Sequence, residues 1–222
     1  MLLISGRRYP ALSPEAWNDL HHIRHMESFP TGSTVFVESQ PCRGVYILHQ
    51  GRAKLTIANS DGKTLIVRIV GPGEILALNP CLTGGMHDTT LLTTQPSEFA
   101  FVRRNEFLHY LNEHKDASYL AGEQLIRDYR DAYDLVRSIA LAQTTNEKLA
   151  RFLLNWAAEP RQTDGGQFLK TRFTHDEIGQ MIGATRETVT RALGLLKRDR
   201  VIEFSGSGLL IRDMTALQQM VS

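Results

Sequence analysis

The sequence is poor in the features that mark secreted, membrane or strongly basic proteins. Only two of its 222 residues are cysteines, Cys42 and Cys81, too few for a disulfide framework or for the roughly four thiolates of an iron–sulfur cluster. The short apolar start at Met1 is interrupted at once by polar residues, so neither a secretory core nor a membrane span is expected. The net charge is only +1. We therefore expect a cytoplasmic globular protein that contacts no membrane.

The sequence also lacks the signatures of common catalytic sites. The β-rich segment contains no His-X-His pair of the kind that ligates a catalytic metal in jelly-roll enzymes. Neither a serine nucleophile elbow nor a phosphate-binding Walker loop occurs anywhere in the chain. We therefore expect no enzyme.

The first hundred residues combine one helix with many short strands. Ser13 can cap a helix that reaches Met26, with Pro14 in its first turn. From Phe29 to Arg103, turn residues separate β-rich runs, and Asp61-Gly62 predicts a hairpin. The expected strands are Thr34–Val37, Val45–Leu48, Ala53–Ile57, Leu65–Val70, Leu91–Thr94 and Glu98–Val102. This pattern predicts a small antiparallel barrel or jelly roll.

A long helical pattern follows, from Asp116 to Leu141. Within it, a heptad spacing of small and apolar residues starts at Ser118 and Gly122 and continues through Leu125, Tyr129, Ala132, Val136 and Ile139. The pattern favours a two-stranded seam between identical subunits. The alternative is a helix that lies on its own barrel.

The remainder of the chain predicts a second folded region. Thr144 or Thr145 can cap a new helix that runs through Trp156, and Pro160–Gly166 is a polar loop. Near the C-terminus, two short strands surround Gly206-Ser-Gly208. The predicted domains are therefore a β-barrel at 1–115, a helix with a hinge at 116–143, and a C-terminal domain at 144–222.

The segment Thr174 to Arg191 predicts a helix-turn-helix, and the two strands after it predict a wing. Thr174 and Glu177 form a capping box, Gly183 suits a turn with positive φ, and Thr185 can cap the second helix. The exposed edge of that helix is predicted to read bases in the DNA major groove, whereas other polar residues suit phosphates. The base-reading candidates are Arg186, Glu187, Thr190 and Arg191, and the phosphate candidates are Thr185, Thr188 and Lys197.

Two other interpretations of this edge remain. Arg186 and Glu187 could be a local ion pair on a solvated helix face. A winged helix could also bind protein instead of double-stranded DNA. The agreement of the cap, turn, buried face, edge and wing favours the DNA-reading interpretation.

The stretch Glu177-Ile-Gly-Gln-Met-Ile-Gly-Ala-Thr-Arg-Glu-Thr-Val-Thr-Arg-Ala-Leu closely resembles the helix-turn-helix of the CRP/FNR family of bacterial transcription regulators. Gly44–Gly51 resembles the family's sensor barrel, and Leu149–Asn155 resembles the helix after its hinge. The resemblance implies an α+β protein with a cyclic-nucleotide-binding type jelly roll, a long dimerisation helix and a winged helix. It also implies a homodimer that reads a near-palindromic, TGTGA-like site, and a contact of the Pro160–Gly166 loop with RNA polymerase.

The expected effector residues depart from the family pattern. Cyclic-AMP-binding members carry a glutamate for the ribose and an Arg-Ser pair for the phosphate; here Leu78 is near the glutamate position, and Asp88 and Thr89 lie where Arg-Ser is expected. Asp88 would repel a phosphate. On the long helix, Tyr133 and Asp134 replace the threonine and serine that contact adenine. We expect no cyclic AMP gating of the usual kind, and the sequence names neither an effector nor a cofactor.

A haem- or metal-binding sensor remains the alternative interpretation of the N-terminal domain. His21 and His25 would share one helical face at i, i+4, a spacing that can bind metal. No third ligand is evident, so a polar helix surface is favoured. Cys42 is interpreted as an ordinary turn residue, and Cys81 and His87 match no haem-ligand pattern.

Overall fold

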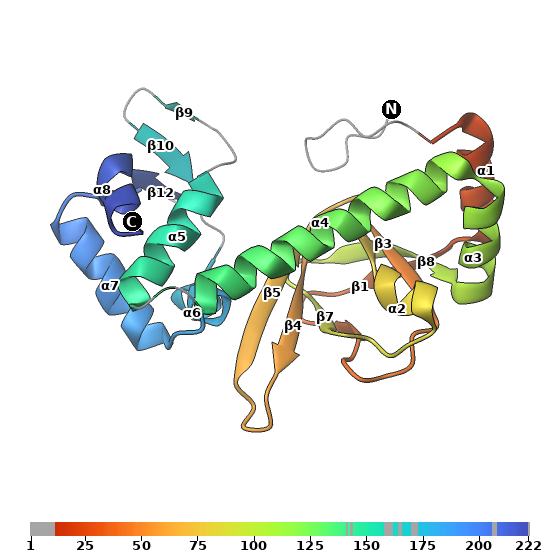
Figure 1. Cartoon of the computed structure of the whole chain (residues 1–222), viewed down its shortest axis with the longest axis horizontal. Helices are drawn as coiled ribbons and strands as arrows, with labels where there is room; N and C mark the ends of the chain where they lie inside the picture. Colours follow the sequence, from red (N-terminus) through yellow and green to blue (C-terminus); the bar gives the residue numbers. More distant parts are fainter. Residues whose placement is uncertain are drawn as a thin grey trace. The chain divides into compact units, whose positions relative to one another are not determined.

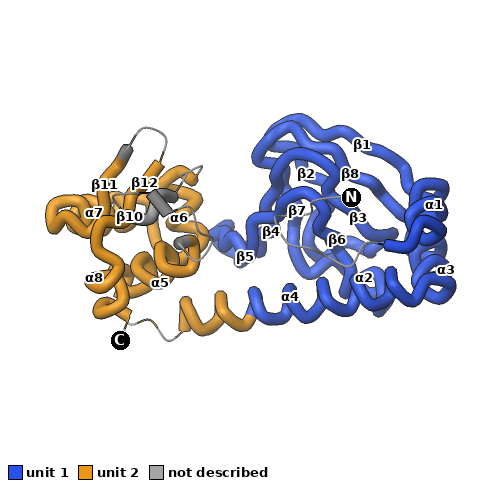
Figure 2. Tube along the Cα trace, turned by 90° about the horizontal axis from the view of Figure 1, so that it is seen from above, with its two compact units in different colours: residues 1–132 blue, residues 133–222 orange. Residues whose placement is uncertain are grey.

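The computed structural model describes residues 12–140, 142, 144–157, 162–163, 166–169, 173–205 and 208–221. The chain divides into two compact units, with the division inside the long helix between Ala132 and Tyr133 (Figure 2). The boundaries predicted from the sequence, at 115/116 and 143/144, stay predictions. Within the described residues, no helix is long and apolar enough to cross a membrane.

The first unit contains two four-stranded antiparallel sheets that face each other, which confirms the predicted jelly-roll class (Figure 1). One sheet has the order β1-β8-β3-β6 and the other β2-β7-β4-β5. Phe99 and Leu48 from the first sheet meet Phe36 and Leu91 from the second in one buried cluster. The strands are β1 His25–Phe29, β2 Thr34–Phe36, β3 Gly44–Gln50, β4 Ala53–Ala58, β5 Thr64–Val70, β6 Ile75–Leu76, β7 Thr90–Thr93 and β8 Ser97–Arg103.

Four helices accompany this barrel: α1 Pro14–Ile23, α2 Leu78–Thr83, α3 Arg104–Glu113 and α4 Lys115–Ala140. In Figure 1, α1 and α3 lie beside the N-terminal part of α4. Ala16, Phe107 and Ala117 from the helices share a second buried cluster with Val45 and Val102 of the first sheet. This cluster attaches the long helix to the barrel.

Two local predictions of the barrel can be compared directly with the structure, and two short elements were not predicted. The Asp61-Gly62 hairpin is confirmed, since β4 pairs with β5 and Gly62 has φ +78°. The helix predicted to reach Met26 is wrong at its end: α1 stops at Ile23 because the chain then turns into β1, which pairs with β8. Two-residue β6 and six-residue α2 are too short to leave a periodic signal, and both were missed.

The second unit is built around one buried cluster that includes Leu149, Ile178, Leu193 and Leu217. Its helices are α5 Thr145–Ala157, α6 His175–Ile182, α7 Arg186–Arg198 and α8 Met214–Gln219. Its strands are β9 Gln162–Thr163, β10 Gly166–Leu169, β11 Ile202–Ser205 and β12 Gly208–Ile211, in the order β11-β12-β10-β9.

This arrangement is the predicted winged helix-turn-helix, with β11 and β12 as the antiparallel wing. Gly206 and Ser207 of the predicted wing turn lie outside the described residues. Within the predicted Pro160–Gly166 loop, Gln162–Thr163 and Gly166 belong to paired strands, and the rest of the loop also lies outside the described residues.

Gly179, inside α6, is required by the close approach of the helix-turn-helix turn. A Cβ atom added there would lie 2.7 Å from the backbone oxygen of Ala184. Gly179 also accepts backbone hydrogen bonds from Gly183 and Ala184, so the two segments cannot separate freely. The sequence signal was a glycine in a helix interior, which often marks a close approach.

We expect Gly179→Val to lower the free energy of unfolding of the second unit by about 1–3 kcal/mol, because backbone must shift to admit the side chain. Gly194→Ala in α7 is the matched control, since a Cβ there meets nothing within 4 Å. Alanine in that helix should be neutral or stabilising by about 0.5–1 kcal/mol. Thermal unfolding of both variants checks the pair; equal stability of the two would contradict the close-approach interpretation.

Candidate DNA-reading surface and effector region

Local hydrogen bonds define the starts of both α6 and α7, which are joined by a tight turn. Thr174 accepts from the Glu177 backbone N–H at 3.1 Å, and Glu177 accepts from the Thr174 backbone N–H at 2.9 Å, which is the predicted capping box. Gly183 ends α6 at φ +68°, and the Thr185 hydroxyl accepts from the Thr188 backbone N–H. These contacts determine which side of α7 is exposed.

The predicted base-reading residues share that exposed side. Val189, Leu193 and Leu196 bury the opposite face of α7. Arg186, Glu187, Thr190 and Arg191 are all exposed. The Glu187 carboxylate has its pKa lowered by its own backbone N–H and by the Thr185 hydroxyl, with Arg186 and Arg191 acting in the same direction. The Glu187 carboxylate can accept from donors on base edges, and the arginines beside it can donate to acceptors there.

Thr190 differs from its neighbours because its hydroxyl is already engaged. It donates to the backbone oxygen of Arg186 at 2.8 Å and lies 2.8 Å from Nδ1 of His175. His175 is the first residue of α6 and was not singled out from the sequence. The contact joins the two helices, so Thr190 has a structural partner beside its predicted base contact.

The phosphate candidates differ from one another in exposure and in the contacts that they make. The Thr185 hydroxyl caps α7 and lies 3.0 Å from the Thr188 hydroxyl, and Thr188 is half-buried. Nζ of Lys197 lies 5.9 Å from the centre of the Phe204 ring in β11. Lys197 therefore joins the recognition helix to the wing strand while its ammonium group stays exposed.

One face of α4 exposes large apolar side chains. Tyr129 is 70% exposed and Val136 is 61% exposed, and both belong to the predicted seam. The other members of this exposed stripe are Tyr119, Ile126 and Tyr133. The spacing of 7, 3, 4 and 3 residues along the stripe follows a heptad pattern.

The remaining predicted seam residues lie elsewhere on the helix. Leu125 is half-buried and packs against the barrel cluster that contains Ala117 and Ala121; its role in the seam stays a prediction. Ala132 is exposed and Ile139 is half-buried. The exposed stripe is therefore turned about the helix axis relative to the predicted seam, because the barrel covers the side of α4 that carries Leu125.

The effector candidates in the barrel do not converge on a phosphate site. Leu78 is 2% exposed and belongs to the barrel core. Asp88 is exposed and accepts a hydrogen bond from Asn79 at 2.9 Å, and Thr89 is half-buried. His87 is stacked on the Phe36 ring at 4.1 Å, and burial lowers its pKa, which disfavours a cationic imidazole.

The two helix candidates, Tyr133 and Asp134, belong to the second unit. Both are exposed, and Tyr133 falls within the apolar stripe of α4. Their effector roles stay predictions.

An ionic cluster joins the barrel to α4 and was missed from the sequence. Arg68 in β5 lies 2.6 Å from Glu74, 3.1 Å from Asp128 and 3.7 Å from Asp131. Asp128 also accepts from the Gln124 amide at 2.7 Å. Arg68 therefore pairs with carboxylates from both the barrel and α4, and Arg127 donates to the Gln124 amide oxygen at 3.2 Å in the same cluster.

The burial of this cluster predicts a pH dependence. Burial raises the pKa of Glu74, and the opposing effects of Arg68 and of the Gly71 N–H do not cancel it. A carboxyl group with a higher pKa in the folded state holds its proton more tightly there. Its contribution to the free energy of unfolding is therefore largest at acid pH and declines as the pH rises through the folded-state pKa.

We expect Glu74→Gln to remove this decline, because glutamine keeps the shape but does not ionise. As the pH rises from about 4 towards about 7, the melting temperature of wild type should fall relative to that of the variant. A constant difference across that range would show that Glu74 does not titrate with folding.

The histidines predicted to share a helical face do not share one. His21 lies in α1, where its Nε2 is 2.7 Å from the Arg24 guanidinium, but His25 begins β1. The i, i+4 arrangement is therefore wrong, because the helix ends before His25. In the part of the chain that the structure describes, no group of three or more His, Cys, Asp or Glu residues could hold a metal ion.

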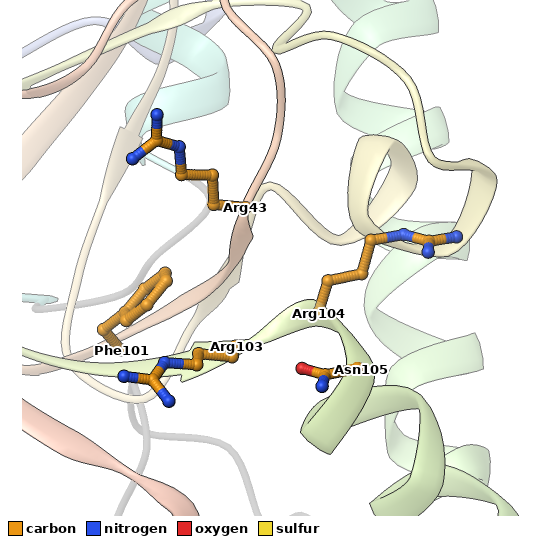
Figure 3. A pocket seen from close by; sticks show the side chains of 5 residues that line it. All are labelled: Arg43, Phe101, Arg103, Arg104 and Asn105. Atoms are coloured by element: carbon orange, nitrogen blue, oxygen red, sulfur yellow. The ribbon is translucent and has the colours of Figure 1, made fainter.

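A shallow cavity of about 470 Å³ lies where β3 begins and β8 ends, lined by Arg43, Phe101, Arg103, Arg104 and Asn105. Figure 3 shows Arg43 and Arg103 on either side of the Phe101 ring, whereas the Arg104 side chain extends away from it. Arg104 donates to the backbone oxygen of Cys81 at 2.7 Å. No carboxylate is among the residues that line this cavity. No spacing in the sequence predicts this cavity, because the arginines come together only through strand pairing.

The jelly roll, the long helix and the winged helix together define a sensor-type transcription regulator. Residues 26–114 match the cyclic nucleotide-binding domain model, and residues 147–220 match the Crp-like helix-turn-helix domain model. The chain belongs to the CRP/FNR family of transcription regulators.

Individual relatives agree with this assignment. The cAMP-activated global transcriptional regulator CRP of Pasteurella multocida is 25% identical over 91% of this chain and 96% of its own length. The CRP-like cAMP-activated global transcriptional regulator of Mycobacterium tuberculosis is 26% identical over 85% of this chain and 84% of its own. The fold resembles a CooA mutant from Carboxydothermus hydrogenoformans with a TM-score of 0.83 and 17% identity, over 99% of this chain and 100% of that one.

Proposed function

We propose that the protein is a homodimeric, sequence-specific DNA-binding regulator that reads a near-palindromic, TGTGA-like site and is not gated by cyclic AMP in the usual way. The observation that carries the proposal is the exposed edge of Arg186, Glu187 and Arg191 on a helix whose other face is fully packed. From the family resemblance alone, we also propose that the Pro160–Gly166 loop contacts RNA polymerase.

The chemistry of this edge suits base reading. An arginine can donate two hydrogen bonds to guanine O6 and N7, and a glutamate can accept from the cytosine amino group. Thr185 caps α7 through the Thr188 backbone N–H, and this contact does not use the guanidinium group of Arg186. The edge is therefore preorganised for a major groove.

The apolar stripe on α4 supports a dimer. Tyr119, Ile126 and Tyr129 are more than half exposed on the side of α4 away from the buried Ala117, Ala121 and Gln124. Large apolar side chains at heptad spacing are typical of a two-stranded seam. Two copies joined there would present two recognition helices to half-sites about one helical turn apart.

The effector region argues against gating by cyclic AMP. The two relatives described above are named as cAMP-activated. In this chain Leu78 is buried in the core, and Asp88 lies where the family resemblance implies a cation. An anionic nucleotide would meet unfavourable charge at Asp88.

Selection of bound sequences from random DNA duplexes, with and without cyclic AMP, tests these statements together. We expect the same two-half-site sequence to be enriched in both conditions. Enrichment only with cyclic AMP would show that cyclic AMP gates the protein, but it would still support sequence-specific DNA binding. Uniform recovery of all sequences would instead support a winged helix that binds protein.

The haem- or metal-sensor alternative is tested by an absorption spectrum and metal analysis of the purified protein. A Soret band or a stoichiometric metal would favour it. Tight DNA binding by protein with neither would remove it.

A further inference from the structure

Two successive hydrogen bonds connect the first residue of α6 with the recognition helix α7. Nδ1 of His175 lies 2.8 Å from the hydroxyl oxygen of Thr190, and that oxygen lies 2.8 Å from the backbone oxygen of Arg186. Ile178 of α6 and Val189 of α7 belong to the same buried cluster, which holds the two helices together. Thr190 itself is exposed, on the edge of α7 that is proposed to read bases.

The chemistry of these three groups determines where the protons are. A backbone carbonyl can only accept, and a hydroxyl has one proton, so the Thr190 hydroxyl donates to the backbone oxygen of Arg186. It has no second proton to donate to His175. The imidazole is therefore the donor, with a proton on Nδ1, and the Thr190 oxygen accepts it. Thr190 thus has no hydrogen left to donate to a base.

The same hydrogen bonds fix the rotation of the Thr190 side chain. A threonine in a helix ordinarily divides between two staggered positions. Here a second hydrogen bond, from a neighbouring helix, selects one of them. The hydroxyl and the methyl group are both attached to Cβ, so a fixed oxygen also fixes the methyl group. The group of Thr190 that remains available to DNA is therefore its methyl group.

We propose that Thr190 recognises a thymine through its methyl group, and that His175 is the positioning residue that presents this group. Thymine carries a C5-methyl group on its major-groove edge, and apolar contact with a threonine methyl is one way to recognise it. The inference rests on the proposed function and deepens it, because it assigns one base contact at the same edge. Arg186, Glu187 and Arg191 would read hydrogen-bonding groups beside it.

Replacement of thymine by uracil in the DNA tests the methyl contact on the unaltered full-length protein. The probe is the duplex that random selection yields, with each thymine of the two half-sites, on either strand, replaced in turn by uracil. Uracil differs from thymine only in lacking the methyl group. We expect one position in each half-site at which uracil weakens binding about fourfold, the factor that corresponds to burial of one methyl group.

Two substitutions at Thr190 separate its methyl group from its hydroxyl. The measured quantity is the ratio of the dissociation constants for the uracil and thymine duplexes at the sensitive position. Thr190→Val keeps a methyl group and should keep a ratio of about four. Thr190→Ser keeps the hydroxyl alone, so its ratio should fall to about one.

Two substitutions at His175 test the positioning role. His175→Asn keeps an N–H donor at the same distance from the backbone, so the ratio should be retained. His175→Leu offers no donor, and its ratio should move towards about one because the Thr190 side chain is no longer held in one position. A merely structural role of His175 would lower thermal stability in this variant and leave the ratio unchanged.

Several results would overturn the inference. Wild-type protein that is insensitive to uracil at every thymine would remove the methyl contact, as would Thr190→Ser that keeps the ratio or Thr190→Val that loses it. An unchanged ratio in His175→Leu would remove the positioning role. If selection yields no preferred sequence, the proposed function itself fails, whereas a preferred sequence that is insensitive to uracil contradicts only the methyl contact.

Discussion

Tyr129→Asp is expected to convert the protein to a monomer and to lower its affinity for a two-half-site duplex by about 100-fold or more. Tyr129 is the most exposed residue of the α4 stripe, at 70%. A carboxylate there would face its symmetry mate in a desolvated seam, where like charges are strongly unfavourable. Loss of the dimer also removes the high effective concentration of the second recognition helix, which is worth about 10²–10⁴ in affinity.

Sedimentation equilibrium and DNA titration measure the two effects separately. Tyr129→Leu is the matched control, since an apolar side chain at the same position should keep the dimer. The winged helix of Tyr129→Asp should remain folded, because the substitution lies outside its core cluster. A wild-type protein that is monomeric, or a Tyr129→Asp variant that dimerises with unchanged affinity, would refute the seam.

The helix-turn-helix of the second unit was predictable because the residues that define it lie close together in the sequence. The capping box at Thr174 and Glu177, the positive φ at Gly183 and the cap at Thr185 each involve residues within four positions of one another. Local hydrogen bonds of this kind are specified by residue type and spacing. The exposed edge of α7 follows once these caps fix the helix.

The first unit was less predictable because its contacts join segments that are distant in the sequence. Arg68 and Asp128 meet only when strand order and register are set, and no spacing rule predicts their contact. Several short elements, such as β6 and α2, also leave no periodic pattern. The ionic cluster around Arg68 therefore could not be predicted from the sequence.

The long helix shows an intermediate case. Its length was predicted closely, but the sequence did not predict that Leu125, a seam candidate, also packs on the barrel. Both neighbouring stripes contain apolar residues, with Ala117 and Ala121 on one and Ile126 and Tyr129 on the other. Periodicity detects such a helix but cannot decide which stripe meets which partner.

Arg186→Ala is expected to weaken binding to the selected DNA site by about 1–3 kcal/mol and to relax the preference at one base pair per half-site. Arg186 is the first residue of α7, exposed, and oriented by the Thr185 cap, so its guanidinium can reach a base edge without moving the helix. Removal of a bidentate contact affects the base that it recognises, whereas removal of a phosphate contact weakens all sequences alike.

The matched control for this substitution is Arg198→Ala, at the opposite end of the same helix. Arg198 is exposed and pairs with Asp199 at 3.0 Å, so its loss should leave base preference unchanged. Repeated selection from random duplexes gives the preference at each position, and titration at fixed salt gives the affinity, since phosphate contacts depend strongly on salt. If Arg186→Ala lowers affinity equally for every sequence and reduces the salt dependence by about one ion, Arg186 contacts a phosphate, and Glu187 and Arg191 must supply the base recognition.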